Sequence, residues 1–533
     1  MALKKSKITL AETGQFSKLL LDYLSGDNDL RNFYSYEPKI ESFLKVIDES
    51  SKENMNRKLL VTVLKEQYSQ ITDKEFQITN INLISDKKTF TVCTGHQLCL
   101  FTGPLYFIYK IITTINLSES LKKNYPKYNF VPIYWMAAED HDFEEIQSVH
   151  LFGKKLTWTN TEAKGAVGGI NTASLRLVID ELKQILGESE NSKELIQLYS
   201  DAYLKNRNLA DATRYLVHQL FGNYGLVIVD GNDSRLKNEF SEIIKDDILN
   251  NTNYKLVNQT ISELEKVGVK AQVNSREINC FYMIDNLRER IVFEDSKYKV
   301  QNTKIEFTKE ELLLELKNHP EHFSPNVVLR PVYQQKILPN LAYIGGPAEI
   351  AYWLEFKKMF DYHKINFPVL IPRNFAMLAD EKTNQQIQKL EFTITDLFKN
   401  ADILIKDFVK KNASSEISLK LEEKKISNIY AEISTKAMAV DATLKGSVEA
   451  ELQKALNALK NLESKLLRSE KQKQETSINQ IKKLKDKFFP EGILQERYEN
   501  ITPYYLKSGE KLIADLKEQF DPLSFEMLIL EVQ

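Results

Sequence analysis

Cysteine is scarce in this chain, and long apolar runs are absent. The 533 residues include three cysteines, Cys93, Cys99 and Cys280, too few for a disulfide framework, which indicates a reducing compartment. No run of about 18 apolar residues occurs that could cross a membrane. The N-terminal residues also lack the apolar core and small-residue cleavage site of a signal peptide. We therefore expect a soluble, cytoplasmic protein with no membrane partner.

An excess of positive charge is also lacking. The chain has 72 Lys and Arg against 74 Asp and Glu, a formal net charge of −2. Proteins that bind nucleic acids electrostatically usually carry a basic surplus, so we expect no nucleic-acid partner. Hydrophobic residues make up 42% and charged residues 27%, which excludes wholesale disorder. At a usual domain size of roughly 100–200 residues, the length predicts three or four structural units, or two with large insertions.

Proline and glycine nearly disappear between Pro372 and Pro490, where Gly446 is the single exception. Proline inside a helix costs roughly 3 kcal/mol and glycine about 1, so their absence permits long helices. Apolar residues spaced three and four apart form a stripe from Ile426 to Leu466, typical of a coiled coil or an antiparallel helical hairpin. We predict a helical coiled-coil arm over 381–490, with the polar run 469–477 either a turn or an exposed stretch of one continuing helix. Because so long a stripe would not be left in water, we expect a homodimer through the arm.

Before the arm, short apolar runs that end in Gly, Asp or Arg alternate with helical stretches. This alternation predicts an α/β fold with a parallel, Rossmann-like sheet over 86–380, whose ligands bind at the carboxyl ends of the strands. Asp and Asn turns within 278–307 predict antiparallel hairpins there. Residues 1–85 have helical spacing and are predicted to form an N-terminal helical cap, and 491–533 a C-terminal segment that packs back on the core. The runs predicted as parallel strands lie within 88–95, 130–140, 224–233, 341–346 and 367–378.

The first candidate site is the segment 93–110, CTGHQLCLFTGPLYFIYK. A predicted strand runs into a loop, and Gly103-Pro104 then opens a helix whose free N–H groups can bind an anion. The alternative is a well-packed turn with a buried histidine. The Cys93-x2-His96-x2-Cys99 spacing lacks a fourth ligand, so we expect no zinc. The candidate binding residues of this segment are Thr94, Gly95, His96, Gln97, Gly103 and Lys110.

The second candidate is the run Glu139-Asp140-His141-Asp142, directly after an apolar strand. Four ionisable residues at the mouth of a sheet could orient an amine, coordinate Mg²⁺, or tune His141 as an acid or base. The alternative is a helix N-cap followed by acidic first-turn residues, a role that Asp140 or Asp142 could fill.

The third candidate lies between Leu329 and Arg373. The Gly345-Gly346-Pro347 loop, with Glu349 in the next turn, would let a ligand approach the backbone. Arg330 and Arg373 could bind a carboxylate or phosphate through two hydrogen bonds, or each could form a buried salt bridge instead. Asp230 ends another predicted strand and could hold a ribose or an amine, or serve as a simple turn residue.

Long motifs in the three segments resemble one known family. No G-x-S-x-G elbow, HExxH, Walker A, kinase set or CxxC occurs, so the corresponding hydrolase, protease, nucleotide-hydrolase and redox functions lose support. TGHQLCLFTGPLYFIYK, PIYWMAAEDHDFEEI and LRPVYQQKILPNLAYIGGPAEIAYW, followed by a long helical arm, resemble the BshC family of bacillithiol-biosynthesis cysteine ligases over essentially the whole chain. Many members have TGQQ at 94–97, which favours Gln97 over His96 as the functional residue.

The resemblance implies a core related to class I aminoacyl-tRNA synthetases, with insertions at about 150–220 and 255–325, and a coiled coil that mediates dimers. It implies addition of L-cysteine to glucosaminyl malate, the last step of bacillithiol synthesis, with carboxyl activation by ATP, and possible Mg²⁺, inferred by analogy. A non-catalytic nucleotide-binding scaffold with a partner-recruiting arm is the alternative.

The expected roles in such a ligase follow the three segments. The loop after the first strand, with Gln97, Lys110 and the Gly103-Pro104 helix start, would hold phosphate or the acyl carboxylate. The run 139–142 would position the attacking amine, with His141 as the first candidate for the base. Arg330 and Arg373 would hold malate carboxylates or phosphate, and the Gly345-Gly346 loop would admit ligand backbone contacts.

Overall fold

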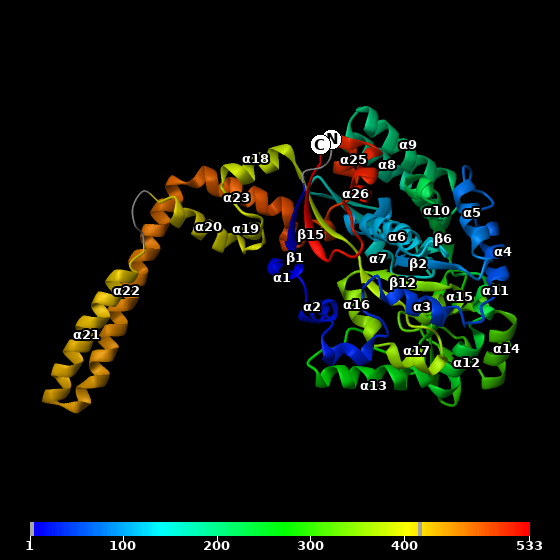
Figure 1. Ribbon diagram of the computed structural model, residues 1–533, viewed down its shortest axis with the longest axis horizontal. Helices are drawn as coiled ribbons and strands as arrows, with labels where there is room; N and C mark the ends of the chain where they lie inside the picture. Colours follow the sequence, from blue (N-terminus) through cyan, green and yellow to red (C-terminus); the bar gives the residue numbers. More distant parts are fainter. Residues whose placement is uncertain (1–4, 414–417, 533) are drawn as a thin grey trace. The chain divides into compact units, whose positions relative to one another are not determined.

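The computed structural model describes residues 5–413 and 418–532. The chain forms two compact units: one extends up to Ala379 and includes the segment from Leu494 on, and the other is Asp380–Ile493 (Figure 1). The first four residues of the predicted N-terminal cap and the last residue of the predicted C-terminal segment lie outside the described residues. Among those described, no helix combines the length and the hydrophobicity needed to cross a bilayer.

A five-stranded parallel sheet forms the centre of the first unit. Its strand order is β13-β12-β2-β3-β6. The chain builds β2, β3 and β6 outward in one direction and then returns to add β12 and β13 on the other side of β2. This order confirms the predicted Rossmann-like fold and puts the switch point between β2 and β12. The strands are β2 (Thr89–His96), β3 (Asn129–Met136), β6 (Val227–Asp230), β12 (Asn340–Gly345) and β13 (Val369–Pro372).

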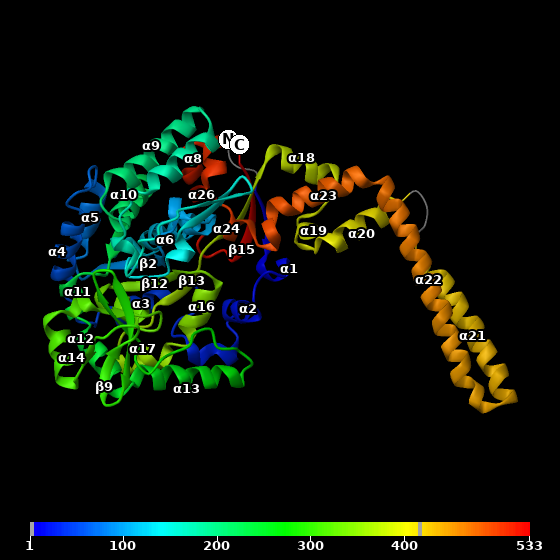
Figure 2. The same ribbon diagram turned by 180° about the vertical axis from the view of Figure 1, so that it is seen from behind.

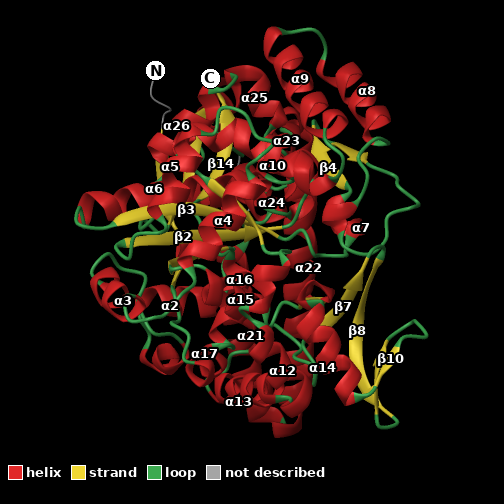
Figure 3. Ribbon diagram, turned by 90° about the vertical axis from the view of Figure 1, so that its right-hand side faces the viewer, coloured by secondary structure: helices red, strands yellow, loops and turns green. Residues whose placement is uncertain are grey.

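Alternate residues of these strands build the core, because side chains two apart point to the same face. Phe90 and Val92 of β2 pack with Val369 and Ile371 of β13 in one buried cluster. Helices cover the sheet (Figure 3). Two of them, α3 (Ser42–Ser50) and α6 (Leu105–Asn124), supply Phe43, Val46, Ile47, Leu117 and Leu121 to this cluster.

Two long insertions interrupt the sheet. Between β3 and β6 come α7 (Phe143–Ile146), β4 (Ser148–Leu151), β5 (Lys154–Thr157), α8 (Leu175–Leu186), α9 (Glu190–Lys205) and α10 (Leu209–Phe221). The second begins with α11 (Ser234–Asn238), α12 (Ser241–Asn250) and α13 (Thr252–Lys266). It continues with β7 (Cys280–Ile284), β8 (Leu287–Glu294), β9 (Lys297–Val300), β10 (Glu306–Phe307), α14 (Lys309–Asn318), β11 (Phe323–Pro325) and α15 (Arg330–Ile337). The predicted antiparallel hairpins are confirmed, because β7 to β11 form one antiparallel sheet.

The sequence predicted a helical N-terminal segment, but this segment begins with a strand. Its strand β1 (Lys5–Thr9) pairs antiparallel with β15 (Glu526–Val532), which also neighbours β14 (Phe375–Asp380). The partner strand lies at the other end of the chain, so no local periodicity could report the pairing. The remaining N-terminal helices are α1 (Leu10–Thr13), α2 (Lys18–Ser25), α4 (Arg57–Gln67) and α5 (Glu75–Leu83). The C-terminal helices of this unit are α24 (Gln495–Tyr498), α25 (Thr502–Ser508) and α26 (Lys511–Gln519).

The second unit is helical. Its helices are α18 (Glu381–Lys389), α19 (Ile394–Phe398), α20 (Ala401–Lys411), α21 (Lys420–Val440), α22 (Lys445–Lys473) and α23 (Glu475–Phe488). Helices α21 and α22 lie side by side as a hairpin (Figures 1 and 2). The turn interrupts the apolar stripe at Asp441, where the backbone is extended and the carboxylate accepts a hydrogen bond from the Thr443 N–H. The polar run 469–477 is not this turn; it spans the junction of α22 and α23.

Candidate active site

The carboxyl ends of the parallel strands gather the predicted site residues at one edge of the sheet. Strands β2, β3, β6 and β12 end at His96, Met136, Asp230 and Gly345, directly before or within the predicted segments. Arg330, from the start of α15, joins them: a Cβ added to Gly95 would lie 3.4 Å from Arg330 Nη1. This edge, at the switch point between β2 and β12, is where α/β sheets bind ligands.

A buried ion pair joins the two loops that flank the switch point. Lys110 of α6 pairs with Glu349 of α16 (Pro347–Leu354), and Lys110 Nζ also donates to the Gly95 carbonyl at 2.9 Å. Glu349 accepts further hydrogen bonds from the Tyr343 hydroxyl at 2.6 Å and the Gly346 N–H at 2.7 Å. Burial opposes the charge of Glu349, but Lys110 holds its pKa below the usual value. Lys110 therefore fixes the loops and is not free to bind phosphate.

The two candidate arginines have different surroundings. Arg373 is buried in an ion pair with Glu496, with 2.7 Å between Nη2 and Oε1, which is the salt-bridge alternative raised for it. Arg330 donates from Nη1 to the Gln334 side chain at 3.0 Å and lies 5.6 Å from the centre of the Tyr343 ring. No carboxylate of the described chain lies within 4.0 Å of its guanidinium nitrogens. The charge of Arg330 is therefore available to pair with an anionic ligand, whereas the charge of Arg373 is already paired with Glu496.

The residues of the acidic run after β3, 139–142, each contact a different partner. Glu139, which is partly buried, forms an ion pair with the buried Lys237, and Asp142 accepts from the Glu145 N–H at 3.2 Å as the N-cap of α7. His141 Nδ1 lies 2.6 Å from Arg288 Nη1. Partial burial and the Arg288 charge lower the pKa of His141, so the imidazole is neutral near pH 7.

This geometry argues against the predicted role of His141 as a general base. An arginine can only donate, so Nδ1 must carry the lone pair and Nε2 the proton. A neutral imidazole has one such lone pair, and here it already accepts from Arg288. His141 can therefore donate a hydrogen bond from Nε2 to a ligand.

Gln97 holds two carboxylates together at the same edge. Its Nε2 donates to Asp140 Oδ2 at 2.8 Å and to Glu145 Oε2 at 2.7 Å. Asp140 Oδ1 also accepts from the His141 N–H at 2.7 Å. Glu145 was missing from the predicted site, although its position three residues after the Asp142 cap indicates a first-turn residue. Asp140 and Glu145 together can bind a cationic amine or a hard metal ion.

Several other predicted residues serve the local structure. Thr94 donates from its hydroxyl to the Ile344 carbonyl at 2.8 Å, which ties β2 to β12. Gly103 has φ +65°, and a Cβ there would lie 2.6 Å from Cys99 Cβ. Asp230 accepts from the Asn232 N–H at 2.9 Å, the turn role raised for it. His96 is enclosed by Tyr106 and Phe107, and burial lowers its pKa to about 3.

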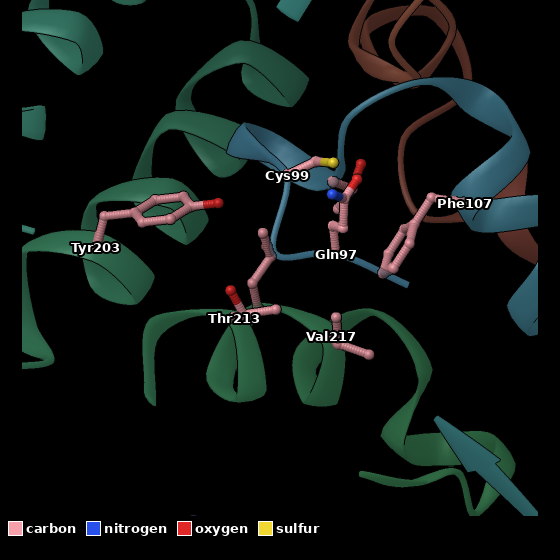
Figure 4. Close-up of a pocket in the computed structure, with 8 residues that line it drawn as sticks. Gln97, Cys99, Phe107, Tyr203, Thr213 and Val217 are labelled. Atoms are coloured by element: carbon pink, nitrogen blue, oxygen red, sulfur yellow. The ribbon is translucent and has the colours of Figure 1, made fainter. Parts of the chain in front are cut away.

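A narrow crevice opens beside Gln97 (Figure 4). Gln97 and Cys99 lie on one side of it, and Thr213 and Val217 of α10 on the other. The buried hydroxyls of Thr102 and Thr213 line the crevice and have no hydrogen-bond partner among the described residues. Burial raises the pKa of Cys99 to about 12, so its thiol stays protonated and is a poor metal ligand. No sequence pattern indicated a role for Thr102 or Thr213.

The family follows from comparisons with known proteins. Residues 3–374 match the model of the N-terminal Rossmann-like domain of bacillithiol biosynthesis BshC, and residues 376–532 match the model of its C-terminal coiled-coil domain. The chain belongs to the BshC family. It is therefore a ligase of the bacillithiol-biosynthesis family, as its sequence motifs predicted.

The relatives match over 95–99% of their length. A protein of Flavobacterium psychrophilum named "Putative cysteine ligase BshC" is 46% identical over 98% of this chain and 99% of the relative. Proteins with the same name from Flavobacterium johnsoniae and Bacillus thuringiensis are 45% and 28% identical, over 98% and 94% of this chain and 99% and 95% of theirs. Among solved structures, a putative arginyl-tRNA synthetase from Campylobacter jejuni aligns over 86% of this chain and 98% of that one, with 11% identity and a TM-score of 0.18.

Proposed function

We propose that this BshC-family ligase joins L-cysteine to the amine of glucosaminyl malate, with ATP activating the cysteine carboxyl. The observation that carries the proposal is that one short loop meets both groups: Gly95 lies beside Arg330, which has no carboxylate partner among the described residues, and Gln97 holds the Asp140–Glu145 pair. The substrates match this arrangement, because glucosaminyl malate carries both carboxylates and an amine and ATP carries phosphates. Arg330 supports binding of the anionic group and the carboxylate pair supports binding of the amine.

The fixed ion pairs define what the remaining side chains can do. The N-terminus of α16 is capped by Glu349, so Arg330 is the better anion ligand at this edge. Asp140 and Glu145, held by Gln97, would orient the amine, and Asp140 would accept its proton as the amide bond forms. ATP supplies the leaving group on the cysteine carboxyl.

The proposal is tested by assaying the purified chain with L-cysteine, glucosaminyl malate and ATP. We expect bacillithiol in a thiol-labelling mass assay, and the nucleotide product identifies the activation step: AMP indicates an adenylate and ADP an acyl phosphate. Arg330→Met should raise the KM for an anionic substrate about 10–100-fold, the range for a lost hydrogen bond to a charged group. Stabilisation by ATP alone, with no product from any combination of substrates, would favour the nucleotide-binding scaffold instead.

We also propose that the protein works as a homodimer in the cytoplasm, where ATP and reduced thiols are available. Support for the dimer comes from the α21–α22 hairpin, in which no apolar residue is fully buried. Ile429 is 53% exposed and Leu462 50% exposed, so the pairing of the two helices leaves apolar surface uncovered. A second copy of the same hairpin could cover it, since coiled-coil seams of this spacing pack on one another.

A further inference from the structure

Metal-ligating side chains cluster outside the candidate active site, in the loop that follows α14. His319, Glu321 and His322 each offer a ligand atom, and these atoms all lie within 4.8 Å of one another. Pro320 opens a 3₁₀ turn, Pro320–His322, which brings the three side chains together. No other group of three such residues meets this criterion in the part of the chain that the structure describes.

Glu315, a neighbour of the cluster, orients the His322 ring as an outer-shell carboxylate orients a metal-ligating histidine. His322 Nδ1 lies 2.7 Å from Glu315 Oε1, and Glu315 also accepts from the Tyr282 hydroxyl at 2.8 Å. With Nδ1 engaged by a carboxylate, His322 is left with Nε2 as its free ligand atom. The His319 and His322 rings are stacked, with centroids 4.8 Å apart and planes 12° from parallel. His319 Nδ1 lies 3.2 Å from Glu321 Oε1, which brings the carboxylate to the same place.

Contrary to the expectation of no zinc, which was drawn from the cysteine segment, we propose that His319, Glu321 and His322 bind a divalent transition-metal ion of the zinc class. Two imidazoles and a carboxylate are a donor set that zinc accepts, with the fourth position left for water. Magnesium and calcium prefer oxygen ligands throughout, and soft ions such as Cu(I) prefer sulfur, so this mixed set favours Zn²⁺ or Co²⁺. Glu315 is then a positioning residue that holds His322 in its ligating orientation.

The site adjoins the groups that hold the acidic loop of the candidate active site. The Glu321 carbonyl accepts a hydrogen bond from Lys237 Nζ at 3.1 Å, and Lys237 is the ion-pair partner of Glu139. The strand that follows, β11, contacts Arg288 through Ser324 Oγ at 3.0 Å and the Pro325 carbonyl at 3.3 Å. A bound ion would therefore fix the segment that contacts Lys237 and Arg288, the two cationic side chains that pair with Glu139 and His141. This inference concerns metal binding and stands whether or not the proposed ligase reaction is correct.

The test is a metal titration of the full chain after dialysis against a chelator. We expect Zn²⁺ to bind at one equivalent per chain by calorimetry, and Co²⁺ to give the visible spectrum of a nitrogen–oxygen site without thiolate charge-transfer bands. His319→Ala, His322→Ala and Glu321→Gln should each weaken Zn²⁺ binding at least ~10-fold, and Glu315→Gln by about 10–100-fold, the usual loss when a second-shell partner is removed. His363→Gln serves as the matched control, because His363 contacts Asn253 and lies outside the cluster.

Folding of each variant is checked by circular dichroism, and zinc should raise the melting temperature of the wild type more than that of His319→Ala. The proposal is overturned if no stoichiometric Zn²⁺ binds, or if the cluster variants bind it as the wild type does. Thiolate bands in the Co²⁺ spectrum would also overturn it, since they would locate the metal at a cysteine.

Discussion

Replacing Arg373 by methionine should destabilise the first unit without acting on the substrate directly. Arg373 is 2% exposed and Glu496 is fully buried, and the two form an ion pair. Glu496 Oε2 also accepts from the Ala376 N–H at 3.1 Å, and the guanidinium lies 4.7 Å from the centre of the Phe375 ring. Removing one member leaves the other charge buried without compensation, a change that typically costs about 3–5 kcal/mol.

Urea unfolding followed by tryptophan fluorescence measures the stability of the first unit, which contains the Arg373–Glu496 pair. All three tryptophans, Trp135, Trp158 and Trp353, lie in the unit that contains the pair. We expect Arg373→Met to lower the free energy of unfolding by about 3–5 kcal/mol. The double variant Arg373→Met, Glu496→Leu should recover much of the loss, because apolar residues often replace a buried pair at little cost.

Arg330→Met is the matched control, because it is the same chemical change at an arginine with no carboxylate partner in the described chain. Arg330→Met should lower the free energy of unfolding by about 1 kcal/mol, the usual contribution of a hydrogen bond such as the one to Gln334. Its main effect should be a higher KM for the anionic substrate. The reasoning fails if Arg373→Met unfolds within about 1 kcal/mol of the wild type and raises the KM for an anionic substrate. That result would restore Arg373 to the binding site.

Three further predictions concern His141, the arm and pH. His141→Asn retains an acceptor for Arg288 and should lower the rate less than ~10-fold; a loss of ~100-fold or more in a folded variant would show that His141 is the base after all. Glutamates at Ile429 and Leu462 should halve the mass in sedimentation, whereas Leu177→Glu, at an exposed position of the other unit, should not; an unchanged mass would mean that the arm is not the interface. Burial raises the pKa of Glu355 from 4.5 to about 7, so its protonated form contributes stability below about pH 4.5 that is lost as the pH rises through 7. Between about pH 4.5 and 7.5 the wild type should therefore lose roughly 1–3 kcal/mol of unfolding free energy relative to Glu355→Gln. Parallel curves of unfolding free energy against pH for the two proteins would contradict the raised pKa.

Local patterns were sufficient for the parallel sheet and insufficient for two other features. Each central strand is an apolar run closed by a polar or glycine residue, a signal contained within a few neighbouring residues. The turn of the helical hairpin at Asp441 carries no glycine or proline, and the apolar spacing continues across it, so periodicity allowed a hairpin but could not locate its turn. The β1–β15 pair joins the two ends of the chain, and its stability comes from a partner that no sequence window contains.

In the candidate site, too, the sequence predicted where the residues lie but not which partners they contact. The sequence located the polar residues at the carboxyl edge because a parallel sheet brings its strand ends together. It could not say which charges would be compensated, because the partners come from distant segments: Lys237 for Glu139, Arg288 for His141, and Glu496 for Arg373. A buried charge is costly unless it is paired, so folding assigns a partner to most of the charges at this edge. Arg330, supported by neutral groups, is the exception, and the electrostatic cost of leaving it without a counter-charge is removed when an anionic ligand binds.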